Sequence, residues 1–193
     1  MVHDKLKPGC LRKADFLVFG SLLTLLFYFF APAIAQAIMI QEDASGIYRD
    51  KNDFFSCQVP QEWIKQESSQ DTVSEVRFTS PDGKAGLAIF AQLDDRELNQ
   101  LFFDKKAYIK NYQQFFPQGE FSLDWDTLGE RAVVRIILDL PSKVKQEQYF
   151  FYDQGVRFDL IYGVANREDF NKYRPRALDI FQTVRRQAPN KNK

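Results

Sequence analysis

The sequence predicts an α+β fold in which helices pack on a mainly antiparallel β-sheet. Apolar and polar residues alternate in several short runs, which is typical of half-buried strands. Two longer segments instead repeat apolar residues every three or four positions, as amphipathic helices do. The order of strands, a long helix, four strands and a final helix does not alternate as βαβ units do. An antiparallel sheet is therefore favoured over a parallel one.

The first 37 residues have the parts of a secretory signal. A basic region at Lys5–Lys13 precedes an apolar run at Phe16–Ala35, and small residues at the spacing that signal peptidase prefers close the segment, as Ala33-Ile34-Ala35 or Ala35-Gln36-Ala37. We expect cleavage and a periplasmic or secreted location. The alternative is an uncleaved anchor in the cytoplasmic membrane, because the apolar run is twenty residues long.

Removal of residues 1–37 would limit the chemistry of the mature chain. The full chain has 26 basic and 26 acidic residues, and loss of four basic and two acidic ones leaves 22 and 24. This near-neutral chain has no basic block, so nucleic-acid binding is not expected. His3, the only histidine, and Cys10 would also be lost. Cys57 then has no partner for an intramolecular disulfide.

The expected organisation is a polar lead-in at residues 38–47, one domain at residues 48–185 and a disordered polar tail at residues 186–193. The turn residues Pro81-Asp82-Gly83 join two alternating runs and favour a hairpin. The predicted elements of the first half are strands at Phe54–Val59, Ser74–Thr79 and Ala85–Ala91, followed by a helix at Asp95–Phe116.

The second half is expected to add four strands and a closing helix. Asp153-Gln154-Gly155 is a hairpin signal between the last two strands. Pro175 interrupts the closing helix, which either kinks there or restarts with Pro175 in its first turn. The predicted elements are strands at Glu120–Leu128, Glu130–Leu140, Gln146–Tyr152 and Val156–Val164, and a helix at Arg167–Val184.

Four consecutive aromatic residues, Tyr149 to Tyr152, place large rings on both faces of one predicted strand. We expect a helix to cover the second face of the sheet. An exposed apolar patch suited to a partner is the alternative.

No catalytic residue is predicted in the mature chain. Cys57 would need a base to form a thiolate, and the mature chain has no histidine, so a buried packing role is expected. Ser142-Lys143-Val144-Lys145 has the S-x-x-K spacing of penicillin-recognising enzymes, but the S-D-N and K-T-G motifs are absent. We interpret this stretch as a polar connection between strands.

No cofactor or metal site is predicted, with a calcium site as the remaining alternative. Asp94 or Asp95 is expected to cap the helix that follows. Asp124 and Asp126 lie on the same face of a predicted strand, opposite Trp125, and are expected to be solvated. Two carboxylates do not supply the six or more oxygens that calcium takes. Zinc of the histidine and cysteine type is excluded by the residue counts.

Several segments follow one another in an order that resembles the PsbP-like family of extracytoplasmic domains. They are Phe54-Phe55-Ser56-Cys57-Gln58-Val59-Pro60-Gln61-Glu62-Trp63, Val76-Arg77-Phe78, Gly86-Leu87-Ala88-Ile89-Phe90, Tyr149-Phe150-Phe151-Tyr152, Gly155, Phe158-Asp159-Leu160, Phe170, Tyr173, Pro175, Ile180 and Phe181. The resemblance covers residues 47–185 and implies an α-β-α sandwich around an antiparallel sheet. It implies no catalytic residue, because no catalytic motif defines the family.

The resemblance implies an accessory or binding role, since the best-known members of the family are lumenal proteins associated with photosystem II. We expect an exported non-enzymatic domain that supports a protein complex at the outer face of the cytoplasmic membrane. Contact with the membrane would come only through an uncleaved signal or through the complex. The alternatives are an extrinsic photosystem II protein and an enzyme that uses only carboxylates and lysine.

Overall fold

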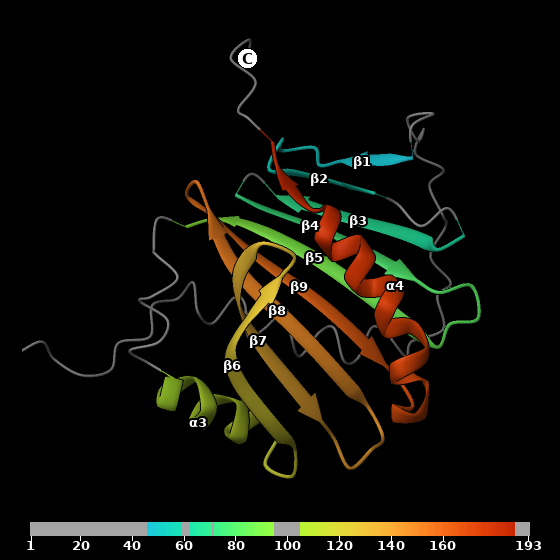
Figure 1. Ribbon diagram of the computed structural model, residues 1–193, viewed down its shortest axis with the longest axis vertical. Coiled ribbons are helices and arrows are strands. Elements are labelled where there is room, and N and C mark those ends of the chain that lie inside the picture. The colour runs from blue at the N-terminus through green and yellow to red at the C-terminus, as the bar shows by residue number, and fades with distance from the viewer. Residues whose placement is uncertain (1–45, 59–61, 71, 95–104, 188–193) are drawn as a thin grey trace, which may run out of the picture. The chain divides into compact units, whose positions relative to one another are not determined.

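The computed structural model describes residues 46–58, 62–70, 72–94 and 105–187 (Figure 1). The predicted signal and most of the lead-in lie outside these residues, as do Asp95 and the first part of the predicted long helix. Among the described helices, none has the length and apolar character needed to cross a bilayer. The elements in chain order are β1 (Ile47–Arg49), β2 (Phe55–Gln58), β3 (Ile64–Gln70), β4 (Val73–Thr79), β5 (Ala85–Leu93), α3 (Lys105–Phe115), β6 (Glu120–Leu128), β7 (Arg131–Asp139), β8 (Lys145–Asp153), β9 (Val156–Val164), the 3₁₀ helix η1 (Arg167–Asp169), α4 (Phe170–Thr183) and β10 (Arg185–Arg186).

The main sheet has seven strands in the order β3-β4-β5-β9-β8-β7-β6, and every neighbouring pair is antiparallel. The central strand β9 joins the two halves of the sheet, since Leu160 lies opposite Ile89 of β5 on one side and opposite Tyr149 of β8 on the other. A small second sheet has the order β1-β2-β10. The predicted antiparallel arrangement is confirmed.

The β8–β9 hairpin forms where the sequence predicts it. Gln154 and Gly155 both have positive φ, 48° and 74°. A two-residue turn with positive φ at both positions matches the right-handed twist of the flanking strands. The turn thus fixes the pairing of β8 with β9, a strand in which every residue is buried.

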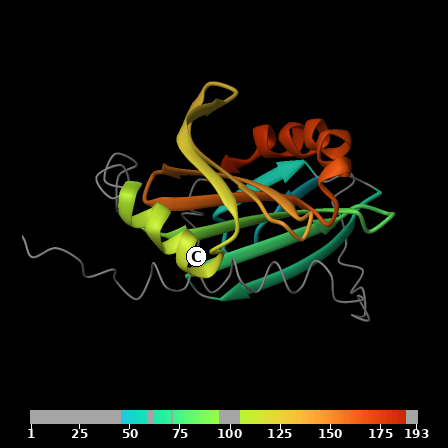
Figure 2. The same cartoon turned by 90° about the horizontal axis from the view of Figure 1, so that it is seen from below.

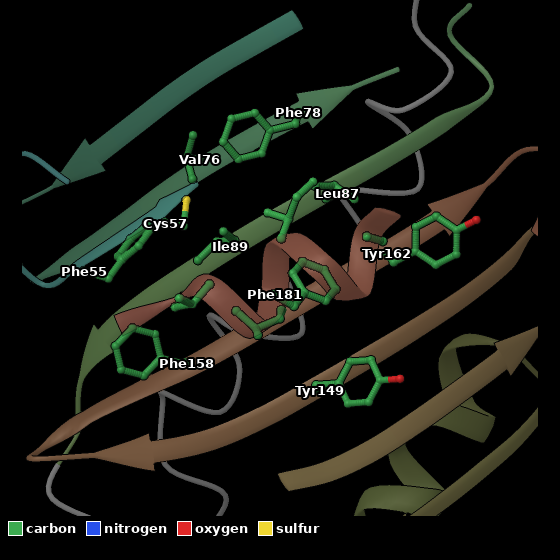
Figure 3. Close-up of a cluster of buried hydrophobic side chains, with 14 of the residues drawn as sticks. Phe55, Cys57, Val76, Phe78, Leu87, Ile89, Tyr149, Phe158, Tyr162 and Phe181 are labelled. Carbon is green, nitrogen blue, oxygen red and sulfur yellow. The ribbon is translucent and has the colours of Figure 1, made fainter. Parts of the chain in front are cut away.

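The larger part of the core lies between one face of the sheet and α4 (Figure 3). Phe158 stacks on Phe151 at 4.8 Å between ring centroids and meets Phe55 of the small sheet edge-on. Phe181 of α4 packs edge-on against Tyr149. The rings therefore tie β8, β9, the small sheet and α4 into one apolar cluster.

The opposite face of the sheet is covered by α3. Tyr108 stacks on Phe150 with 6.2 Å between ring centroids, and Tyr112 contacts Phe121. In Figure 2 the sheet is seen nearly on edge, with α4 on one side of it. The expected helical cover over both faces of the aromatic strand is confirmed, and the layers follow the α-β-α order.

Three strands and the start of the C-terminal tail differ from the sequence prediction. Strand β3 has one apolar residue, Ile64, so alternation cannot mark it; pairing with β4 makes it a strand. The short strands β1 and β10 were not predicted either. Arg186 pairs with Phe55 in β10, so the ordered chain extends beyond the predicted start of the tail at residue 186. The closing helix runs through Pro175 without restarting there.

Candidate functional site

Cys57 lies on β2 with its side chain buried in the core, as predicted. Burial raises the pKa of its thiol to about 12, although the charge of Lys65 acts in the opposite direction. The thiol is therefore protonated at neutral pH and out of contact with solvent. A protonated thiol is a poor nucleophile, so the position contributes packing rather than reactivity.

Cys57 is expected to react with iodoacetamide about a thousandfold more slowly in the native protein than in the unfolded chain. The rise of the pKa from 9.0 to about 12 lowers the thiolate fraction by that factor before access is considered. Mass spectrometry of the Cys57 peptide, after alkylation with and without guanidinium chloride, measures the ratio. Equal rates in the two samples would contradict the buried placement.

The Ser142–Lys145 stretch connects β7 to β8, as predicted, with Ser142 in the turn and Lys145 as the first residue of β8. Lys143 has φ 70° and donates its backbone N–H to the Leu140 carbonyl. Lys145 begins β8 and lies 3.8 Å from Asp139. The catalytic S-x-x-K arrangement needs the serine at the start of a helix, and this serine lies in an exposed hairpin turn.

The two acid pairs predicted from the sequence are Asp124 with Asp126 and Asp94 with Asp95. Asp124 and Asp126 lie on one face of β6, where Lys105 binds the first at 3.0 Å and Arg135 the second at 3.4 Å. Asp94 donates its backbone N–H to Gly155. The predicted helix cap at Asp94 or Asp95 lies at the edge of the described residues and is not tested. Among the residues that the structure describes, no three His, Cys, Asp or Glu side chains are grouped to hold a metal.

Glu147 forms a buried ionic centre beneath α4. Its side chain is 0% exposed, and two guanidinium groups reach it. Arg174 of α4 donates through Nε at 2.7 Å and Nη2 at 3.0 Å, and Arg135 of β7 donates through Nε at 2.5 Å. Arg174 also donates to the hydroxyl group of Tyr149. The carboxylate thus joins α4 to β7 and β8.

The pKa of Glu147 shows why this carboxylate is a structural group. Burial raises the pKa, but the hydrogen bonds from Arg174 and Tyr149 and the charge of Arg135 outweigh burial and hold it below its ordinary value. The group is therefore ionised at neutral pH, and both of its oxygens accept hydrogen bonds. A carboxylate in this state anchors the helix and is poorly suited to accept a proton.

A second buried polar centre lies on the α3 side of the sheet. Asp159 Oδ1 accepts hydrogen bonds from Arg157 Nη2 at 2.9 Å and from Gln148 Nε2 at 3.1 Å. Tyr112 of α3 donates its hydroxyl group to Gln148 Oε1 at 3.0 Å. The guanidinium group of Arg157 lies over the ring of Phe150, and its side chain is 2% exposed. This chain of hydrogen bonds links α3 to β8 and β9.

Neither buried centre was identified from the sequence. A weak signal was available for one of them, because Arg157 and Asp159 occupy alternate positions beside Ile161 in an otherwise apolar strand. Glu147 gave no such signal, since its two arginines lie 12 and 27 residues away and meet it only through the sheet register and the packing of α4.

The exposed surface of β6 is a third feature of interest. In the described part of the chain β6 is the last strand of the main sheet and pairs only with β7. Trp125 is 46% exposed at its centre, and the side chain of Asp124 is 77% exposed. Large aromatic residues are enriched in protein interfaces, so this edge is the candidate binding surface.

Comparison with known proteins identifies the fold of the domain. No protein-family model and no curated protein matches the sequence. The solution structure of cyanobacterial PsbP (CyanoP) from Synechocystis sp. PCC 6803 is similar, with a TM-score of 0.55 at 10% identity, over 77% of this chain and 98% of that chain. A crystal structure from Bacteroides thetaiotaomicron is similar over 75% of this chain, with a TM-score of 0.53 at 11% identity. This chain covers 49% of that protein.

Both likenesses agree with the antiparallel sheet and the two covering helices described above. At these identities they establish the fold and carry no statement about activity. The α-β-α arrangement implied by the sequence resemblance is confirmed. The described domain has a PsbP-like fold.

Proposed function

We propose that this protein is an exported, non-enzymatic accessory domain that binds a protein partner at the outer face of the cytoplasmic membrane. The single observation that carries the proposal is the half-exposed Trp125 at the centre of the edge strand β6. A buried tryptophan would serve packing, whereas a half-exposed one on the last described strand of a sheet is suited to bury more of its ring against a partner.

The described polar side chains support a binding role over catalysis. The Glu147 carboxylate accepts hydrogen bonds from two arginines, and Asp159 accepts hydrogen bonds from Arg157 and Gln148. The buried Cys57 thiol is protonated at neutral pH. Groups held in this way stabilise the domain, and a general base or nucleophile would need free lone pairs facing a substrate.

The N-terminal segment supports export. Residues 1–37 combine a basic region, an apolar run and alanines at a peptidase spacing, which together are the pattern of a secretory signal. A domain delivered in this way would meet its partner outside the cytoplasm, either in free form or held at the membrane by an uncleaved segment.

A pull-down from solubilised cell envelope tests the binding role. Tagged protein is expected to recover the same partner in repeated preparations, and Trp125→Ala is expected to reduce recovery at least about tenfold, since interface tryptophans are frequent hot spots. Ile64→Ala is the matched control, because Ile64 is 49% exposed on the opposite edge strand β3. Equal recovery with both variants, or no reproducible partner, would contradict the proposal.

An extrinsic photosystem II protein is the second candidate. The likeness to cyanobacterial PsbP extends over 98% of that chain, which favours this more specific reading of the accessory role. Co-purification with photosystem II from a photosynthetic source organism would support it. A non-photosynthetic source would exclude it and leave the general proposal in place.

A further inference from the structure

The two edges of the main sheet are built differently. On β3, Lys65 and Glu67 point toward the core, with their side chains 13% and 7% exposed, and they lie 3.6 Å apart. Inward-pointing charges are a device that prevents a further strand from pairing with an edge. Strand β6 has nine residues without proline, lysine or arginine. The β6 edge thus lacks the inward-pointing lysine and glutamate pair that β3 has.

Acidic side chains follow β6, the last strand of the main sheet among the described residues. Glu120, Asp124 and Asp126 share one face of the strand, and Trp125 lies on the other face between two of them. Lys105 of α3 places its ammonium group 3.0 Å from Asp124 in a largely exposed ion pair. Asp126 likewise lies 3.4 Å from Arg135, in a pair whose side chains are 38% and 29% exposed. Pairs that water reaches contribute little to stability, so a basic side chain of a partner can replace or join Lys105 and Arg135 beside these acids at small cost.

The same acids disfavour pairing between two copies of this chain. If two β6 strands pair antiparallel with Trp125 opposite Trp125, Asp124 of each copy lies opposite Asp126 of the other. Like charges directly opposite one another destabilise a strand pair. The edge therefore discriminates against a second copy and favours a strand with basic residues at alternate positions.

We propose that β6 is a docking edge that accepts an extended basic segment of a partner protein as an additional antiparallel strand. The inference deepens the proposed function and rests on it. Backbone N–H and C=O groups of β6 would pair with the incoming segment, lysine or arginine would lie beside Asp124 and Asp126, and an apolar side chain would cover Trp125. Strand addition of this kind takes affinity from the main chain and specificity from alternate side chains.

A synthetic nine-residue peptide that alternates lysine and valine tests the docking edge. Titrated into isotope-labelled protein, it is expected to shift the NMR signals of the β6 amides and to slow their hydrogen exchange. The same peptide with glutamate in place of lysine, and one with methylated backbone nitrogens, are expected not to bind. Binding of the methylated peptide would overturn the proposal, because a charge patch without strand pairing would then explain the result.

A matched pair of double variants tests the acidic positions. Asp124→Lys with Asp126→Lys is expected to weaken the basic peptide at least about tenfold, because two cross-strand attractions become repulsions. Glu130→Lys with Asp179→Lys makes the same charge change at exposed positions off the β6 strand and is expected to leave binding unchanged. Equal loss in both variants, or no binding to the parent protein, would overturn the docking edge. A partner that the Asp124 and Asp126 variant still recovers from the envelope would also overturn it while supporting the proposed function.

Discussion

Replacement of Asp159 by asparagine is expected to lower the free energy of unfolding by about 3 to 5 kcal/mol. The substitution keeps the size of the side chain and removes its charge. Arg157, whose side chain is 2% exposed, then loses the anion 2.9 Å from its Nη2. Breaking one side of a buried ion pair is strongly destabilising because the remaining charge cannot return to water.

The environment of Arg157 explains why its buried guanidinium group depends on the charge of Asp159. Burial alone would lower the pKa of the guanidinium group, but the charge of Asp159, together with smaller contributions from Tyr108, Tyr152 and the hydrogen bond to Asp159, outweighs burial and raises it above the ordinary value. Within the described residues, Arg157 Nε and Nη1 have no hydrogen-bond partner. Asp159 therefore supplies the main compensation for the buried charge, with the ring of Phe150 as a weaker contributor.

Urea unfolding followed by circular dichroism measures the effect. Asp179→Asn is the matched control, because Asp179 is exposed on α4, and it is expected to change stability by less than about 0.5 kcal/mol. The double variant Arg157→Met with Asp159→Leu removes both charges and is expected to recover a substantial part of the loss. If Asp159→Asn is as stable as Asp179→Asn, the charge of Arg157 is compensated by another anion or by water, and the expectation is wrong.

The sequence predicted the strands that the hydrophobic pattern defines. Glu120–Leu128 and Val156–Val164 have the predicted bounds, because one face or both faces of each strand meet a helix or the core. Strand β3 lacked that signal, since polar residues follow Ile64 on an edge strand. Strand β4 holds β3 in an extended conformation through backbone pairing, and the composition of β3 does not indicate this pairing.

The candidate sites were harder to predict than the elements. Cys57 and the Ser142–Lys145 turn could be assigned locally, because a buried strand and a polar hairpin are local patterns. The Glu147 centre depends on which residue of β7 lies beside β8 and on which face of α4 points down. To predict such long-range contacts, one must know the strand register and the orientation of the helix. Neither can be read from the pattern of a single sequence. The place of β6 at the end of the described sheet likewise follows from the strand order rather than from the residues of β6 itself.

Glu147→Gln is expected to destabilise the protein by about 2 to 3 kcal/mol at neutral pH, because it removes the anion shared by two charge-assisted hydrogen-bonding partners. The loss is smaller than at Asp159 because Arg135 and Arg174 are 29% and 31% exposed and water can solvate them. Since the pKa of Glu147 is lowered in the folded protein, its contribution is present above the ordinary value of 4.5. It is lost as the pH falls through the folded value.

The pH dependence separates this ionic role from simple packing. Unfolding free energies of parent and Glu147→Gln, measured from neutral pH downward, are expected to differ by a constant amount and then to converge below pH 4.5 as the native carboxyl group becomes protonated. The exposed control Glu130→Gln is expected to follow the parent throughout. A gap between parent and Glu147→Gln that persists in acid would mean that side-chain packing, rather than the charge, holds α4 on the sheet.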